Sequence, residues 1–243
     1  MNEERKAEGW DFCCAPPSCA QMMGASCGVM AQKAPVLIVF DIDGTIADSA
    51  MLGRELFKRI FERLGYGIIS DELADSFNGP TADEVCRVMG VGEDRRPLYD
   101  ELLGSIEDEL MHEQGTMFPG VGKMLETLAP HAVLALLTNG TPRYCDTCIR
   151  EFSLSPYISL HAGYITGISK AQRMEMWARE IGARRIVCVG DRGTDVSNGR
   201  KVGALTIAVT YGMGSREELA GADVICDTTA EVTEACLRAI GEY

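Results

Sequence analysis

Short aliphatic runs recur along the chain from Pro35 onward, and each has the length of a β-strand. The first is Val36-Leu37-Ile38-Val39-Phe40, a continuous β-prone run that is typical of a strand covered on both faces. Further runs of this kind cover residues 132–137, 185–189, 204–209 and 223–226. Because helical segments separate these runs, the pattern predicts right-handed βαβ units and an α/β fold with a doubly wound parallel sheet.

Capping signals mark several of the helix ends. Thr141-Pro142 supplies an N-cap and a proline at the first helical position. Ser215-Arg216-Glu217-Glu218 has the spacing of a capping box. Gly182 ends a helix that begins near Ala171. These signals support helices in the intervals between the predicted strands.

The interval from Asp48 to Met117 breaks the alternation, because it contains helical patterns and no convincing strand. One helix ends at Gly65, a second begins at the capping box Thr81-Ala82-Asp83-Glu84, and a third runs from Pro97 to near Gly115. The apolar stripes of the first and third helices are Leu52, Leu56, Phe57, Ile60, Phe61 and Leu64, and Leu98, Leu102, Ile106 and Leu110. We therefore expect a core in two pieces, 35–47 and 118–243, and an inserted all-α cap domain at 48–117.

Residues 1–34 show neither helical nor strand periodicity, and we interpret them as a flexible N-terminal tail. Their four cysteines are Cys13, Cys14, Cys19 and Cys27. A thiolate metal site is an alternative, although the paired C-x2-C spacing of such sites is missing. A third interpretation is that translation starts later, at Met22, Met23 or Met30.

Composition and charge narrow the function classes. The 243 residues include 23 Lys and Arg against 36 Asp and Glu, a net charge of −13, which argues against nucleic acid or an anionic membrane as the main partner. No aliphatic run approaches the ~20 residues of a membrane span, and the N-terminus has no apolar run of signal-peptide length. We expect a soluble, cytoplasmic protein whose ten cysteines are mostly free thiols.

Most of the residues that could take part in catalysis or binding come directly after the aliphatic runs. Asp41 and Asp43 follow the first run and, at positions i and i+2, project from the same side of an extended chain. Gly44 permits a tight turn in which backbone N–H groups approach an anion closely. The other members of the set are Thr138-Asn139-Gly140, Lys170, Asp191 and Asp195. Because ligands of open α/β sheets bind at the carboxyl ends of the strands, we expect these residues to converge.

This ordered set resembles the haloacid dehalogenase-like (HAD) superfamily of phosphatases over about residues 35–243. Asp41-Ile42-Asp43-Gly44-Thr45 looks like the first motif of that superfamily, and the helical insertion after it is similar to one of its cap types. The second, third and fourth motifs correspond to Thr138-Asn139-Gly140, Lys170 and Gly190-Asp191…Asp195. Phe118-Pro119-Gly120-Val121 is a further detail shared with phosphoglycolate phosphatase-like members. Ala171 after Lys170 departs from the Lys-Pro pair of many relatives.

The resemblance implies a role for each of these residues. Asp41 would attack phosphorus and form an aspartyl-phosphate, while Asp43 would act as general acid and then as general base. Thr138, Asn139 and Lys170 would position the phosphoryl oxygens, with Gly44 and Asp195 in support. Mg²⁺ would be held by Asp41, Asp191 and the backbone carbonyl of Asp43. His112, His131 and His161, placed in the cap, at a strand entry and in a loop, have no ligand spacing.

A count of the charges in this set of residues supports a bound metal ion. Four carboxylates and one ammonium group leave an excess of three negative charges in this set. Two unit charges ~4 Å apart interact with about 4 kcal/mol at an effective dielectric constant of ~20. A phosphate dianion therefore needs a divalent cation to enter the site, and a set of oxygen ligands suits Mg²⁺.

The function expected from these motifs is Mg²⁺-dependent hydrolysis of a small phosphorylated metabolite, such as a phosphoglycolate-like compound or a sugar phosphate. A phosphomutase of the same superfamily, similar to β-phosphoglucomutase, is an alternative, and so is a phospho-accepting signalling module. Asn78-Gly79-Pro80-Thr81 is either a substrate-facing loop of the cap or a plain connector. No nucleic acid or membrane partner is expected, and the chain would act as a monomer or a homodimer.

Overall fold

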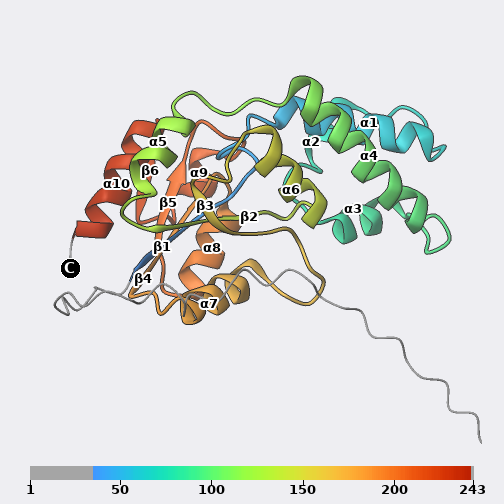
Figure 1. Ribbon diagram of the computed structural model, residues 1–243. Helices are drawn as coiled ribbons and strands as arrows, with labels where there is room; N and C mark the ends of the chain where they lie inside the picture. The colour runs from blue at the N-terminus through green and yellow to red at the C-terminus, as the bar shows by residue number, and fades with distance from the viewer. Residues whose placement is uncertain (1–34, 242–243) are drawn as a thin grey trace, which may run out of the picture. The chain divides into compact units, whose positions relative to one another are not determined.

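In the computed structural model, which describes residues 35–241, six parallel strands form one sheet in the order β3-β2-β1-β4-β5-β6 (Figure 1). The strands are β1 (Val36–Phe40), β2 (Val133–Leu137), β3 (Ile158–Ala162), β4 (Arg185–Gly190), β5 (Leu205–Val209) and β6 (Val224–Cys226). The α/β fold class predicted from the alternation of strands and helices is confirmed. The switch in strand order lies at β1, whose carboxyl end is therefore the expected ligand site.

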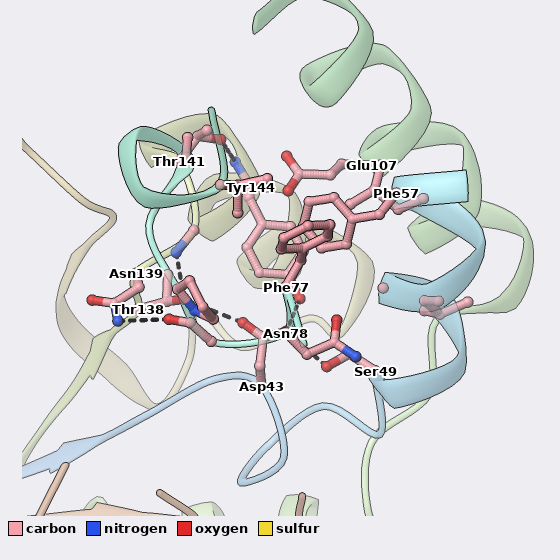
Figure 2. Close-up of a pocket in the computed structure, with 18 of the residues that line it drawn as sticks. Asp43, Ser49, Phe57, Phe77, Asn78, Glu107, Thr138, Asn139, Thr141 and Tyr144 are labelled. Atoms are coloured by element: carbon pink, nitrogen blue, oxygen red, sulfur yellow. Dashed lines mark hydrogen bonds between the residues drawn. The ribbon is translucent and has the colours of Figure 1, made fainter. Parts of the chain in front are cut away.

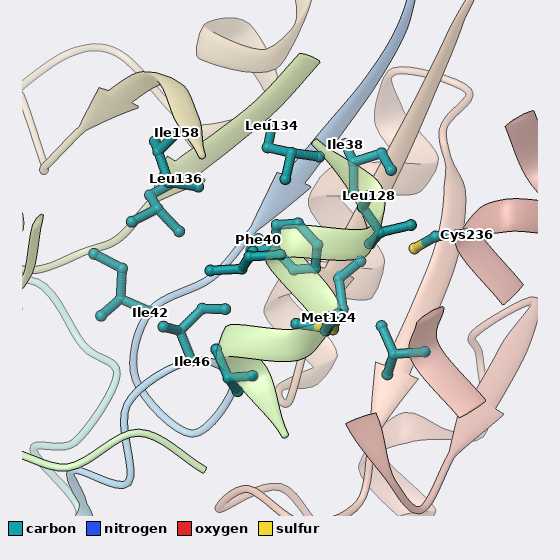
Figure 3. Close-up of a cluster of buried hydrophobic side chains, with 14 of the residues drawn as sticks. Ile38, Phe40, Ile42, Ile46, Met124, Leu128, Leu134, Leu136, Ile158 and Cys236 are labelled. Carbon is teal, nitrogen blue, oxygen red and sulfur yellow. The ribbon is translucent and has the colours of Figure 1, made fainter. Parts of the chain in front are cut away.

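Helices cover both faces of the sheet, which explains why β1 is apolar throughout. Ile38 and Phe40 pack in one cluster with Met124, Leu128 and Cys236, as Figure 3 shows. The helices on this face are α5 (Val121–Leu128), α6 (Pro142–Glu151) and α10 (Thr229–Gly241).

The other face of the sheet is covered by α7 (Lys170–Glu180) and α8 (Gly193–Lys201). Leu37 and Val39, the alternate residues of β1, pack there against Met174 and Trp177 of α7. Near the end of the sheet, α9 (Arg216–Leu219) is a single short turn of helix.

Four helices and no strand lie within residues 48–117, all of which the structure describes. They are α1 (Ala50–Arg63), α2 (Asp71–Asp75), α3 (Ala82–Met89) and α4 (Arg96–Gln114). They share their own apolar cluster, which includes Phe57, Phe61 and Tyr99. The capping box predicted at Thr81 and Glu84 is present at the start of α3. We call these helices and their connections the cap; its boundaries as a domain stay a prediction.

The predicted buried face of α4 is partly wrong. Leu98 is 45% exposed, while Tyr99, Leu103, Ile106 and Leu110 are buried. The predicted stripe and the observed buried face share Ile106 and Leu110 in the later turns of α4. In the first turn they differ, because Tyr99 lies about 100° around the helix axis from Leu98. The aromatic ring of Tyr99 buries more apolar surface than Leu98 would and determines which side of the first turn faces inward.

Two further sequence expectations need correction. The strand β3 was missed, and His161 lies in it rather than in a loop, with its Nε2 3.0 Å from Asp146 Oδ1. As an edge strand it alternates polar and apolar residues and has no continuous aliphatic run. At the predicted capping box, the Ser215 hydroxyl accepts a bond from Glu218 N, and the Glu218 carboxylate also accepts a bond from Gly193 N.

The predicted tail at 1–34, with its possible metal site, lies outside the described residues. The six cysteines that the structure describes have free, buried thiols. No helix within residues 35–241 has the length and apolar character needed to cross a bilayer.

Candidate active site

The turn after β1 places two carboxylates at the carboxyl edge of the sheet. Asp41 N donates to Val189 O at 2.9 Å, so the pairing of β1 with β4 continues up to the buried Asp41. Gly44 follows with a φ of +72°, and a Cβ there would lie 2.0 Å from Asp191 Oδ2. Only glycine fits this turn, because the conformation is left-handed and a carboxylate fills the space.

Asp191, at the end of β4, is fully buried and surrounded by backbone. Met213 N donates to its Oδ2 at 2.7 Å. A Cβ atom at Gly212 would lie 2.5 Å from that Oδ2, and a Cβ atom at Gly214 would lie 1.9 Å from the Asp191 carbonyl oxygen. The Asp191 Oδ1 atom has no hydrogen-bond partner in the described part of the chain. Burial raises the pKa of Asp191 to about 7, with a contribution from Asp195, although the Met213 N–H opposes the shift.

Three of the predicted carboxylates converge closely. Asp41, Asp191 and Asp195 each offer an oxygen, and these atoms lie within 4.8 Å of one another. Burial, and then the charges of Asp195 and Asp191, hold the pKa of Asp41 well above its ordinary value, although Lys170 opposes this. A buried cluster of oxygen ligands with one orphaned carboxylate oxygen fits a hard divalent cation such as Mg²⁺.

The Asp43 carboxylate lies outside this cluster and is held by three hydroxyl groups (Figure 2). Ser49 Oγ and Tyr144 Oη donate to its Oδ1 at 2.7 and 2.6 Å, and Thr138 Oγ1 donates to its Oδ2 at 3.2 Å. The side chain of Asp43 is therefore not among the metal-ligand candidates, and the predicted role of its backbone carbonyl stays a prediction. Three donors therefore fix the orientation of the Asp43 carboxylate.

Lys170 neutralises part of the carboxylate cluster. Its Nζ donates to Asp41 Oδ1 at 2.7 Å and to Asp195 Oδ1 at 2.8 Å. Burial lowers the pKa of Lys170, but the two carboxylates outweigh burial and hold the pKa above its usual range. Lys170 is the first residue of α7, where the reciprocal capping bonds of Ser169 and Gln172 fix the helix start.

Thr138 and Asn139, predicted to bind phosphate, are engaged with protein groups in this structure. The Thr138 hydroxyl donates to Asp43 and accepts from Gly140 N at 2.9 Å. Asn139 Nδ2 donates to the carbonyl oxygen of Gly79 at 2.8 Å. Both residues line the same cavity as Asp41 and Lys170, so the structure brings all the predicted phosphate-binding residues to one place.

Residues 78–81, which lie between α2 and α3 in the cap, are bonded to side chains of the core. Besides the Asn139 bond to Gly79, Arg192 Nη1 donates to the carbonyl oxygen of Asn78 at 3.1 Å, while its Nε pairs with Glu218 at 3.1 Å. Asn78, Gly79 and Pro80 line the cavity, and contact of this loop with a substrate stays a prediction. The cavity between cap and core has a volume of about 100 Å³.

Several residues of the site carry no signal in the sequence. Tyr144 lies 101 positions after Asp43 and reaches it because the Thr141 N-cap starts α6 one turn earlier. Glu107 and Tyr99, on α4, line the cavity from the cap. Their positions depend on how the cap packs against the core, which no local pattern encodes.

The bond from Tyr144 to Asp43 predicts a measurable effect. Burial, and then the charge of Asp43, raise the pKa of the Tyr144 hydroxyl well above its ordinary value, so the group stays a donor. Tyr144→Phe removes one charge-assisted bond and is expected to lower kcat about tenfold, with a smaller change in KM. Tyr66→Phe, which removes a hydroxyl bonded to Gly90 O within the cap, is the control. Equal kcat values for the two variants would show that Tyr144 does not position Asp43.

The comparisons with known proteins agree with this architecture. A family model for haloacid dehalogenase-like hydrolases matches residues 38–209. Tyrosine-protein kinase PtkA of Mycobacterium tuberculosis is 26% identical over 218 residues, covering 86% of this chain and 74% of the relative. A phosphoglycolate phosphatase of Vibrio parahaemolyticus is 24% identical, covering 84% and 97%. The crystal structure of a predicted phosphatase from Clostridium acetobutylicum superposes with a TM-score of 0.73 at 22% identity, covering 84% and 99%.

Proposed function

The chain belongs to the haloacid dehalogenase-like hydrolase family, as its motifs indicated, and we propose that it is a Mg²⁺-dependent phosphatase of a small phosphorylated metabolite. The observation that carries this proposal is the buried group of Asp41, Asp191 and Asp195 with Lys170 between two of the three carboxylates. Such a group has no structural advantage, because unpaired buried charges destabilise a fold. The cluster is explained if it binds a divalent cation and, with that cation present, binds a phosphate ester and reacts with it.

The proposed reaction divides phosphoryl transfer into two steps. A carboxylate oxygen of Asp41 attacks phosphorus, the bond from phosphorus to the ester oxygen breaks, and Asp43 protonates the departing oxygen. Asp43 then removes a proton from water, whose oxygen attacks the aspartyl-phosphate and releases inorganic phosphate. The three hydroxyl donors around Asp43 would hold its carboxyl group in one orientation through both steps.

The metal would be held by Asp41 and Asp191, with the Asp43 carbonyl as the third protein ligand. When bound, Mg²⁺ neutralises charge on the phosphoryl oxygens. Lys170 adds a fixed positive charge, and Asp195 holds its ammonium group in place through the 2.8 Å bond. Thr138 and Asn139 supply neutral donors at the same end of the cavity.

One group of relatives is named tyrosine-protein kinase, and a kinase must bind a nucleoside triphosphate. The cavity beside Asp41 has a volume of about 100 Å³, and a second pocket of about 350 Å³ shares Lys170, Thr138 and Asn139 with it. A phosphatase releases inorganic phosphate from a small ester, whereas a kinase transfers the phosphoryl group to another acceptor. Release of inorganic phosphate in the assay described next therefore distinguishes the two activities.

Removal of the metal tests the proposal. Phosphate release from a panel of phosphorylated metabolites is expected to fall by about 10²-fold or more when Mg²⁺ is chelated, and to return when Mg²⁺ is added back, because the metal stabilises transition-state charge by several kcal/mol. In calorimetry, Asp191→Asn should weaken Mg²⁺ binding, whereas Asp223→Asn, far from the cluster, should not. Undiminished hydrolysis in chelator would contradict the assignment of the carboxylate cluster.

A further inference from the structure

The cavity beside Asp43 extends into the interior of the cap. Its inner part lies between α1 and α4, with Leu56, Phe57 and Leu103 among its walls. Figure 2 shows Phe57, Phe77 and Tyr144 near Glu107, on the cap side of Asp43. Since the proposed phosphate-binding residues occupy the core end of the cavity, the leaving group of a bound ester would lie in this inner part.

Two polar atoms of the inner part have no hydrogen-bond partner within residues 35–241. They are the hydroxyl oxygen of Tyr99, whose side chain is fully buried, and Oε2 of Glu107. Buried polar groups in folded proteins are nearly always hydrogen-bonded, so these two atoms at the cavity wall are available to bond with a ligand or with water. Neither group takes part in the proposed mechanism.

The charges around the inner part favour a cation. Among the described residues that line the cavity, Lys170 and Arg192 are the cationic ones. Lys170 is bound to Asp41 and Asp195, and Arg192 to Glu218 and the Asn78 carbonyl. A leaving group that carried a carboxylate would therefore meet Glu107 and no uncommitted cation of the described chain.

The aromatic walls support the same conclusion. Phe57 and Phe77 pack edge to face with ring centroids 5.3 Å apart, and the Tyr99 and Tyr144 side chains also line the cavity. The faces of such rings attract cations and do not attract anions. Burial, and next the charge of Asp43, raise the pKa of Glu107 well above its ordinary value, which a bound cation would reverse.

We propose that the cap cavity selects phosphate monoesters of small amino alcohols, with the ammonium group of the leaving group bound by Glu107. This inference rests on the phosphatase function proposed above. A cavity of about 100 Å³ holds several heavy atoms, because one water needs only about 10–15 Å³. A two-carbon amino alcohol matches that size, and its apolar carbons would contact Leu103 and Phe57.

Three esters of similar size separate the possible leaving groups. They are O-phosphoethanolamine with an ammonium group, ethyl phosphate with no charge, and phosphoglycolate with a carboxylate. We expect kcat/KM for the ammonium ester to exceed that of ethyl phosphate by at least about tenfold, since charge-assisted bonds are the strong ones, and phosphoglycolate to be the poorest. Glu107→Gln should reduce the ratio of ammonium to neutral ester by about tenfold. Glu109→Gln, an exposed residue on the same helix, should leave the ratio unchanged.

The outcomes distinguish this inference from the proposed function. If ethyl phosphate is hydrolysed but the ammonium ester has no advantage, or Glu107→Gln leaves the ratio unchanged, the inference is wrong and the phosphatase function stands. If no ester is hydrolysed in the presence of Mg²⁺, the proposed function is wrong. Calorimetry with ethanolamine then tests the cavity alone: binding that Glu107→Gln weakens supports the inference, and no binding overturns it.

Discussion

Replacement of Asp41 by asparagine is expected to lower phosphate release by at least about 10³-fold, because the amide cannot form the aspartyl-phosphate. The fold should be retained, since the variant removes a buried charge whose pKa is already held well above its ordinary value by burial. Lys170 keeps its bond to Asp195 in the variant. Steady-state kinetics and thermal unfolding measure the two expectations together.

The matched control for Asp41 is an equally conservative change outside the carboxylate cluster. Asp223 accepts hydrogen bonds from Thr206 N and Oγ1 at 2.8 and 2.7 Å near the other edge of the sheet. Asp223→Asn should keep kcat while lowering stability, the reverse of the result expected for Asp41. Turnover by the Asp41 variant at near the wild-type rate would remove Asp41 as the nucleophile.

Replacement of Asp43 by asparagine is expected to lower kcat by about 10²–10⁴-fold, which is the usual contribution of general acid–base catalysis. The amide cannot donate and accept a proton in turn, while its size keeps the contacts with Ser49 and Thr138. The loss should be smaller for small esters with good leaving groups, because their departing oxygen needs no proton.

Leaving-group dependence therefore separates acid catalysis from a structural role of Asp43. A variant that loses activity equally with esters of good and of poor leaving groups would have been damaged in geometry rather than in proton transfer. A loss of tenfold or less with an alkyl ester would assign Asp43 to holding the site together. Circular dichroism of the variant, compared with the wild-type protein, excludes unfolding as the cause.

The sequence was sufficient to predict the sheet and the convergence of the strand-end residues. Continuous aliphatic runs identified the strands β1, β2, β4, β5 and β6. Parallel pairing brings the carboxyl ends of these strands to one edge of the sheet. Asp41, Asp191 and Asp195 lie together for that reason. Their catalytic roles, and those of Thr138 and Asn139, stay predictions, because closeness in space does not establish a function.

The features that sequence reasoning missed depend on tertiary contacts. The β3 strand lies at the edge and alternates polar and apolar residues, so it lacks the signal of a buried strand. Tyr144 becomes a neighbour of Asp43 when α6 packs against the sheet, and Glu107 does so when the cap packs against the core. Leu98 was assigned to the wrong face because the position of Tyr99, one residue along, determines the buried side of the first turn.

Backbone packs closely around the Asp191 side chain and restricts its rotation. A methyl group on Gly44 would lie 2.0 Å from the Asp191 Oδ2 atom, and one on Gly212 would lie 2.5 Å from it. The rotamer freedom of this carboxylate is therefore lost when the chain folds, and an arriving ion meets a preorganised ligand. The entropic cost of ordering Asp191 falls on folding stability, and it does not weaken the affinity for the ion.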